Sequence, residues 1–195
     1  MLQEKLGLPL HDTFVMGIVS RLTPQKGFHL LQEALPRLLE EDIQVVVVGS
    51  GDADLEHWLY ELQHVFPTKV GVHVGYSEPL ARLVYAGADI FLMPSLFEPC
   101  GLAQMIAMRY GTLPVVRHTG GLADTVIDHM EGGSGFVVHG QDPSVMIEKI
   151  EQAKYFYQTP STWGKLIQQA MRQDFSWHES AKTYGRIYEG ELWRH

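Results

Sequence analysis

An apolar run leads into a loop that carries a single acid in the stretch Ile90-Phe91-Leu92-Met93-Pro94-Ser95-Leu96-Phe97-Glu98-Pro99-Cys100-Gly101-Leu102. The run predicts a buried strand, and the two prolines bound the loop that follows it. Glu98 lies shortly before Gly101, where we expect a helix to begin. A carboxylate beside a helix N-terminus can bind a hydroxylated group and an anionic group together, as a sugar linked to a phosphate requires.

Other apolar segments along the chain also have the length and composition of strands. The run Val45–Val48, like Ile90–Met93, is continuously apolar, which is typical of strands that helices cover on both faces. Longer amphipathic segments separate these runs, so we predict an α/β fold with a doubly wound, mostly parallel sheet of six strands. The expected strands are Phe14–Ser20, Ile43–Gly49, Val70–Val74, Asp89–Met93, Leu113–Val116 and Gly135–Val138.

The amphipathic segments predict helices, and after Val138 the pattern becomes wholly helical. Asp142-Pro143 is typical of an N-cap followed by a proline at the first helical position. Ser176-Trp177-His178-Glu179 has the pattern of a capping box. We find no repeat or linker, so residues 1–195 are expected to form one domain. The expected helices are Phe28–Glu41, Leu55–Val65, Pro79–Ala86, Leu102–Tyr110, Pro143–Tyr157, Thr162–Gln173 and a last helix running from Ser176 towards Leu192.

The composition fits a globular domain and excludes several classes of protein. The chain has 195 residues, 45% of them hydrophobic and 19% charged, with a net charge of −8. This acidic balance argues against a nucleic-acid binder. No apolar run approaches the roughly 18 residues of a membrane span, and the N-terminus lacks the apolar core of a signal peptide. The single Cys100 excludes an intrachain disulfide and suits the cytoplasm, where we expect the protein.

Two cations follow the first expected strand. In a doubly wound sheet ligands bind beyond the carboxyl ends of the strands, so Arg21 and Lys26 should lie on the ligand-binding edge. A guanidinium can contact an anion through two hydrogen bonds, and an ammonium adds a point charge. For an arbitrary pair of cations, simple exposure to solvent is the more common situation. Their place at this edge favours anion binding.

The loop Pro94–Gly101, which carries Glu98 and is called the acid loop below, offers a second set of candidates. Glu98 can cap the helix that follows, as a lone acid before a proline often does. However, Pro99 has no N–H to offer and the neighbouring residues are apolar, so a sugar hydroxyl is the better partner for the carboxylate. The backbone N–H groups of Gly101 and Leu102 can bind a phosphate at the helix start. Cys100 by itself is most often an inert thiol.

Two further strand exits carry candidate residues. Tyr76, after Gly75, is either ordinary packing at a helix entry, with Ser77 as N-cap, or an aromatic surface for a base. The stretch Thr119-Gly120-Gly121 is either a simple turn or a nest of N–H groups for an anion. The fingerprint G-x-G-x-x-G is missing after the first strand, which argues against a nicotinamide enzyme. The histidines do not cluster, so we predict no metal.

In combination, three segments resemble the donor-binding C-terminal domain of bacterial glycogen synthases and plant starch synthases. They are Ser20–Gly27, Pro94–Leu102 and Thr119–Asp124, and the likeness extends from Phe14 to about Tyr188. The resemblance implies a retaining GT-B glycosyltransferase with a Rossmann-like half. Such an enzyme transfers glucose from ADP-glucose to the non-reducing end of an α-1,4-glucan, with neither a metal nor another cofactor.

The resemblance also assigns roles to residues and to the chain as a whole. It implies that Arg21 and Lys26 bind the diphosphate, Glu98 contacts the glucose, Tyr76 with Gly75 meets the adenine, and Cys100, Gly101, Leu102, Thr119, Gly120 and Gly121 line the donor cleft. The family's N-terminal Lys-x-Gly-Gly motif is absent from this sequence. We therefore expect a donor half that binds nucleotide but transfers little sugar alone, with a terminal helix (residues 176–193) that crosses to an N-terminal domain.

Some alternatives stay open. Related retaining enzymes often carry a second Glu eight positions after the first, whereas this chain has Ile106 there, so the group that holds the ribose is not identified. An enzyme that uses UDP-glucose or another sugar nucleotide would keep Arg21, Lys26 and Glu98. A non-catalytic module that binds nucleotide or carbohydrate is the remaining alternative. If the source is a plant, the plastid stroma replaces the cytoplasm.

Overall fold

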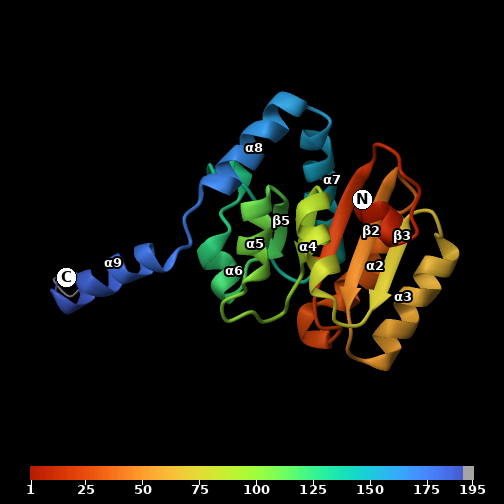
Figure 1. The fold of residues 1–195 in the computed structure, drawn as a ribbon, viewed down its shortest axis with the longest axis horizontal. Helices are drawn as coiled ribbons and strands as arrows, with labels where there is room; N and C mark the ends of the chain where they lie inside the picture. The colour runs from red at the N-terminus through yellow and green to blue at the C-terminus, as the bar shows by residue number, and fades with distance from the viewer. Residues whose placement is uncertain (191–195) are drawn as a thin grey trace.

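The computed structural model describes residues 1–190. This part of the chain forms one six-stranded sheet in the order β3-β2-β1-β4-β5-β6, and every neighbouring pair is parallel (Figure 1). All the expected strands are present, with ends that differ from prediction by at most one residue. Their bounds are β1 Phe14–Val19, β2 Ile43–Gly49, β3 Val70–Val74, β4 Ile90–Met93, β5 Leu113–Arg117 and β6 Phe136–Val138.

Helices cover both faces of the sheet (Figure 1). On one face α2 packs beside α7, and on the other α4 packs against α1 and α5. The predicted doubly wound α/β fold is therefore confirmed. The helices of the described residues are α1 Leu2–Lys5, α2 Phe28–Leu38, α3 Ala53–Val65, α4 Glu78–Gly87, α5 Ala103–Tyr110, α6 Gly120–Thr125, α7 Pro143–Tyr157, α8 Pro160–Arg172 and α9 Trp177–Tyr188, with short 3-10 turns at Pro24–Lys26 and His129–Glu131.

The core lies between the sheet and its two helical layers. The continuous run Val45–Val48 of β2 is buried, as are Ile90 and Phe91 of β4, which confirms that apolar runs without alternation mark strands covered on both faces. Burial of such side chains is the main favourable term in folding. No helix within residues 1–190 has the length and hydropathy that a membrane crossing would need.

The predicted helix starts agree with the structure at two places and fail at a third. Asp142 caps α7 by accepting a hydrogen bond from the Ser144 N–H at 2.9 Å. Ser77 caps α4 more weakly, at 3.4 Å from the Leu80 N–H. The capping box expected at Ser176 is wrong, because the Ser176 side chain makes no capping bond and its own N–H donates to Asp174 at 2.8 Å. Asp174 therefore accepts the hydrogen bond from the Ser176 N–H that the capping-box pattern assigned to Glu179.

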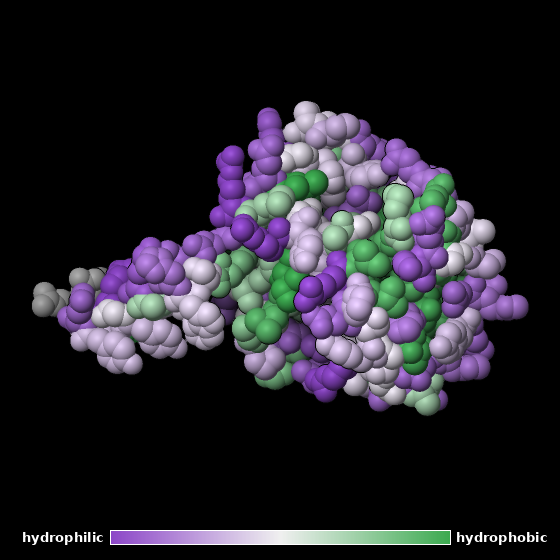
Figure 2. Space-filling model, in the orientation of Figure 1, coloured by the Kyte–Doolittle hydropathy of each residue, from purple (hydrophilic) through white to green (hydrophobic). Residues whose placement is uncertain are grey.

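The last helix, α9, extends away from the body of the molecule (Figure 1). None of its residues is buried, and Trp177 and Tyr188 are 87% and 85% exposed. The predicted continuation to Leu192 and residue 193 lies outside the described residues. Beside the start of α9, Met105, Ile106, Met171 and Phe175 line an apolar groove between α5 and α8, and apolar surface is visible in this region in Figure 2.

One carboxyl group at the amino end of the sheet makes stability depend on pH. Asp89, just before β4, accepts a hydrogen bond from the Val15 N–H at 2.8 Å. Desolvation, reinforced by the nearby Asp12, raises the pKa of Asp89 to about 6. An acid whose pKa is higher in the folded state binds its proton more tightly there. Stability therefore falls as the pH rises from about 3.8, the ordinary pKa of Asp, to about 6, the pKa of Asp89 in the folded state, and stays level above that.

Replacing this acid by its amide isolates the effect. Asp89→Asn keeps a side-chain oxygen for the Val15 N–H and removes the charge, so it should stabilise the fold at pH 8 by on the order of 2 kcal/mol and change it little at pH 4. Urea denaturation at the two pH values measures the difference. The exposed Asp54→Asn is the matched control and should follow the unmodified chain. A loss of stability at pH 8 in Asp89→Asn would contradict the assignment.

Candidate active site

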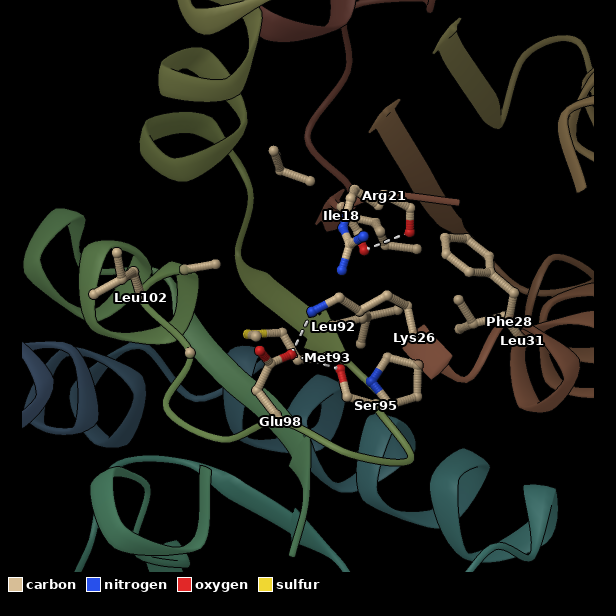
Figure 3. A pocket seen from close by; sticks show the side chains of 15 residues that line it. Ile18, Arg21, Lys26, Phe28, Leu31, Leu92, Met93, Ser95, Glu98 and Leu102 are labelled. Carbon is tan, nitrogen blue, oxygen red and sulfur yellow. Dashed lines mark hydrogen bonds and ion pairs between the residues drawn. The ribbon is translucent and has the colours of Figure 1, made fainter. Parts of the chain in front are cut away.

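Strands β1 and β4 are neighbours at the centre of the sheet. From β1 the chain adds β2 and β3 on one side, and it then adds β4, β5 and β6 on the other, so the direction of winding reverses between β1 and β4. In sheets of this kind ligands bind at such a point, beyond the carboxyl ends of the strands. A cavity of about 180 Å³ lies there (Figure 3). Its polar lining comes from the two strand exits and the start of α5, and includes Arg21, Lys26, Ser95, Glu98 and Gly101.

A glycine contact brings the two strand exits together. Gly27, between the 3-10 turn and α2, has φ +76°, a conformation that side chains rarely adopt. A Cβ built there would lie 2.0 Å from the carbonyl oxygen of Pro94. Only glycine therefore allows the start of α2 to approach the loop after β4 this closely. The approach places Lys26 next to the loop that carries Glu98.

Lys26 and Glu98 form an ion pair at the cavity wall (Figure 3). The Lys26 Nζ lies 2.5 Å from Glu98 Oε2, and the two side chains are 17% and 11% exposed. Ser95 Oγ donates a hydrogen bond to the same carboxylate oxygen at 3.1 Å. In this structure the acid accepts from side chains at the cavity, so the alternative reading of Glu98 as a helix cap is not supported.

Arg21 is the second cation of the cavity. It is exposed, and its guanidinium points toward the cavity in Figure 3. Within residues 1–190 no acidic side chain is paired with it, so its charge is available to a ligand. The structure thus brings Arg21, Lys26 and Glu98 to one cavity, although they are spread over 78 positions of sequence, counting Arg21 as the first.

A second cavity of about 250 Å³ adjoins the first. Ser20 and Arg21 line both cavities, and Gly75 and Tyr76 line only the second. Tyr76 is 90% exposed, so its ring is free to stack on a planar group. Ser77 caps α4, as the helix-entry interpretation predicts. Tyr76 is not packed against the helix, so its ring stays available to a base, as the other interpretation requires.

The stretch Thr119–Gly121, after β5, contacts the backbone of the acid loop. The Gly121 N–H donates to the backbone oxygen of Glu98 at 3.0 Å, and Thr119 Oγ1 lies 3.5 Å from the oxygen of Leu96. A Cβ on Gly120 would come within 2.2 Å of the Glu98 oxygen. The amide of Gly121 is therefore occupied by the protein, which corrects the expectation that it belongs to an anion nest. The stretch is also helical rather than a simple turn, since α6 begins at Gly120.

Of four further residues predicted to contact the donor, two line the first cavity and two line neither cavity. Gly101 and Leu102 line the first cavity and directly precede α5, which begins at Ala103, one residue later than predicted. Cys100 is exposed and, like Thr119, is not among the residues that line either cavity. Within the described residues no group of three or more His, Cys, Asp or Glu side chains is arranged to hold a metal.

The sequence analysis missed two side chains that fix the acid loop. The side-chain amide of Gln25 donates to the backbone oxygen of Phe97 at 3.0 Å, and the backbone oxygen of Gln25 accepts from the Leu96 N–H at 2.8 Å. Arg117, at the end of β5, donates to the oxygens of Ser95 at 2.9 Å and Gly140 at 2.7 Å. It is 8% exposed, and burial lowers the pKa of its guanidinium. The available signal was a cation that closes the apolar run Leu113–Val116.

Residues 13–153 match the family model described as glycosyl transferases group 1. The chain is 47% identical over 192 residues to a glycogen synthase of Geobacillus thermodenitrificans, and 44% identical over 197 residues to one of Bacillus licheniformis. These alignments cover 96% and 98% of the chain but only 40% and 41% of the relatives.

A solved structure gives the same result. The chain superimposes on the catalytic domain of starch synthase IV from Arabidopsis thaliana, bound to ADP and acarbose, with a TM-score of 0.87 and 36% identity. The match covers 99% of this chain and 42% of that one. A sucrose-phosphate synthase from Thermosynechococcus elongatus, at 23% identity and a TM-score of 0.73, shares the fold.

The bracing role of Arg117 can be tested without a ligand. Arg117→Lys keeps the charge but cannot reach both carbonyl oxygens, so we expect a loss of stability of about 2 kcal/mol and faster hydrogen exchange at Leu96 and Gly121. Arg109→Lys is the matched control, because Arg109 also donates to a backbone oxygen, that of Met171, but at an exposed position. Equal effects of the two substitutions on exchange in this loop would contradict the role.

Proposed function

The chain belongs to the glycosyl transferases group 1 family, and we propose that it is the donor-binding part of a glycogen or starch synthase, which transfers glucose from ADP-glucose to the non-reducing end of an α-1,4-glucan. The chain spans about 40% of the length of the curated glycogen synthases that it matches. The acceptor, the nucleotide and the activity of a whole enzyme are therefore parts of the proposal.

One observation carries the proposal: a guanidinium and an ammonium from the segment after β1 meet a carboxylate from the loop after β4 at a single cavity. Arg21 and Lys26 supply two positive charges, which suit a diphosphate and stabilise the negative charge that grows on it as the bond to the sugar breaks. Glu98 accepts hydrogen bonds from sugar hydroxyls and orients the glucose. The charge is neutralised by side chains of the chain itself, so the proposed mechanism requires no metal.

The nucleotide would extend from the first cavity into the second. Because Ser20 and Arg21 line both, a diphosphate beside Arg21 can join a sugar near Glu98 to a base near Tyr76. The ring of Tyr76 offers a flat, exposed surface for stacking, which is tolerant of the base. The starch synthase neighbour was solved with ADP, which favours adenine in the proposal over the alternative uracil.

We further propose that α9 and the apolar groove between α5 and α8 contact an acceptor-binding domain of the complete enzyme. α9 has no buried residue, and Trp177, Tyr184 and Tyr188 are exposed on it. The relatives are more than twice as long as this chain, so they contain sequence that can cover these surfaces. A polypeptide consisting of residues 1–195 should then bind donor but transfer little glucose.

Calorimetric titration with ADP, UDP and NAD tests the choice of nucleotide. ADP should bind most tightly. Tyr76→Ala should lower the affinity for ADP by roughly 10-fold, because it removes about 1–3 kcal/mol of stacking. Tyr60→Ala, which removes another exposed tyrosine far along α3, is the matched control and should change nothing. Tighter binding of UDP than ADP would favour the UDP-glucose alternative, and binding of glucan without nucleotide would favour a non-catalytic module.

The role of Glu98 requires an enzyme that turns over. A chimera that places this chain after the preceding part of the Geobacillus thermodenitrificans glycogen synthase should transfer glucose to glycogen, whereas the chain alone should not. In the chimera Glu98→Gln should lower kcat by about 100-fold or more without weakening nucleotide binding, because the carboxylate orients the sugar. Glu41→Gln serves as control. Unchanged kcat would mean that Glu98 has been misassigned, and robust transfer by the chain alone would overturn the proposed division.

A further inference from the structure

In the ligand-free structure Lys26 and Glu98 are paired with each other. The proposed function needs them for different tasks, since Lys26 binds the diphosphate and Glu98 binds the sugar. Lys26 Nζ lies 2.5 Å from Glu98 Oε2, so the ammonium is directed at the acid in this ligand-free state. The side chains are 17% and 11% exposed, and in such partial burial an ion pair is screened less by water than at the surface. A diphosphate can gain Lys26 only by taking it from Glu98.

The two partners differ in how far they can move. Glu98 belongs to a loop that accepts hydrogen bonds from the Gly121 N–H and the Gln25 side chain, and Ser95 donates to its carboxylate. Lys26 reaches the acid through a flexible four-carbon stem, which can turn without any change in the backbone. Exchange of partners therefore requires movement of one side chain, that of Lys26. Among residues 1–190 no acid is paired with Arg21, so its guanidinium can meet the anion first.

We propose that the Lys26–Glu98 pair is a latch that couples the two halves of the donor. The diphosphate draws Lys26 away from Glu98, and the carboxylate oxygen that is released then accepts hydrogen bonds from the hydroxyls of the sugar. This inference rests on the proposed function and adds a mechanism of selectivity to it. No covalent bond changes in this step.

The latch has different consequences for donor and product. A sugar nucleotide replaces both lost contacts, one at Lys26 and one at Glu98. A nucleoside diphosphate without a sugar replaces only the first and leaves a partly buried carboxylate with Ser95 as its remaining partner, which is costly. The pair therefore favours the intact donor over the spent diphosphate. After transfer, the return of Lys26 to Glu98 favours release of the product.

A double-mutant cycle with inorganic pyrophosphate tests the latch apart from base and sugar. Glu98→Gln should raise the affinity for pyrophosphate by about tenfold, because Lys26 no longer has to leave an acid. A tenfold change corresponds to the free energy of about one charge-assisted hydrogen bond. In a Lys26→Gln background the same substitution should give little gain. Glu41→Gln, which removes a comparable pair with Lys154 at 2.6 Å, is the matched control and should have no effect.

Each outcome decides the inference. A gain from Glu98→Gln that persists undiminished in Lys26→Gln would reflect general charge repulsion and would overturn the latch, as would no gain at all. Thermal melting confirms that each variant is folded, and Glu98→Ala gives a second variant if Glu98→Gln is not.

The same proteins separate this inference from the proposed function. The preference for ADP-glucose over ADP should be reduced in Glu98→Gln relative to the unmodified chain. ADP that binds no better than pyrophosphate would count against the nucleotide in the proposed function while the cycle with pyrophosphate still supports the latch. Normal ADP binding with no coupling between Lys26 and Glu98 would leave the proposed function standing and remove the latch.

Discussion

The close approach of Gly27 to the carbonyl oxygen of Pro94 is the constraint on which the candidate site depends. It joins the exit of β1 to the exit of β4, and a side chain at position 27 would collide with the backbone of the second loop. The same approach lets Gln25 bond to Phe97 and Leu96 and lets Lys26 reach Glu98. Two functional groups that lie 72 positions apart in sequence are thereby fixed within one ion pair.

A second layer of support comes from the next strand. Arg117 at the end of β5 bonds to the oxygen of Ser95, and Gly121 at the start of α6 bonds to the oxygen of Glu98. The acid loop is thus held on one side by the β1 exit and on the other by the β5 exit. Because several of its backbone groups are paired with neighbouring segments, its position is set by the fold and is not left to a ligand.

Much of this arrangement could be predicted from the sequence, and the rest has a common physical reason for escaping prediction. The continuous apolar runs identify the strands, and the parallel sheet then places Arg21 and Glu98 at the same edge. Contacts between loops, such as those of Arg117 and Gln25, depend on backbone groups that carry no sequence signal. The pairing of Lys26 with Glu98 is missed because it depends on the close approach of two loops that lie 72 positions apart in sequence. The helix α6 is missed because it begins with two glycines, which disfavour helices, and at Ser176 the capping rule fails because Asp174 accepts from the same amide.

The site combines loops held by hydrogen bonds with exposed side chains, and this limits how it can act. The loops are braced, whereas Arg21 and Tyr76 are exposed and Lys26 is held through a single flexible side chain. Binding within this chain can therefore proceed by rearranging side chains on a fixed backbone, at a smaller ordering cost than closing a loop. Pairing Lys26 with Glu98 avoids an unpaired, partly buried charge on either side chain, whereas Arg21 is exposed to solvent. In the proposed latch, the charge of Lys26 is therefore held in the pair with Glu98 until a diphosphate replaces the acid as its partner.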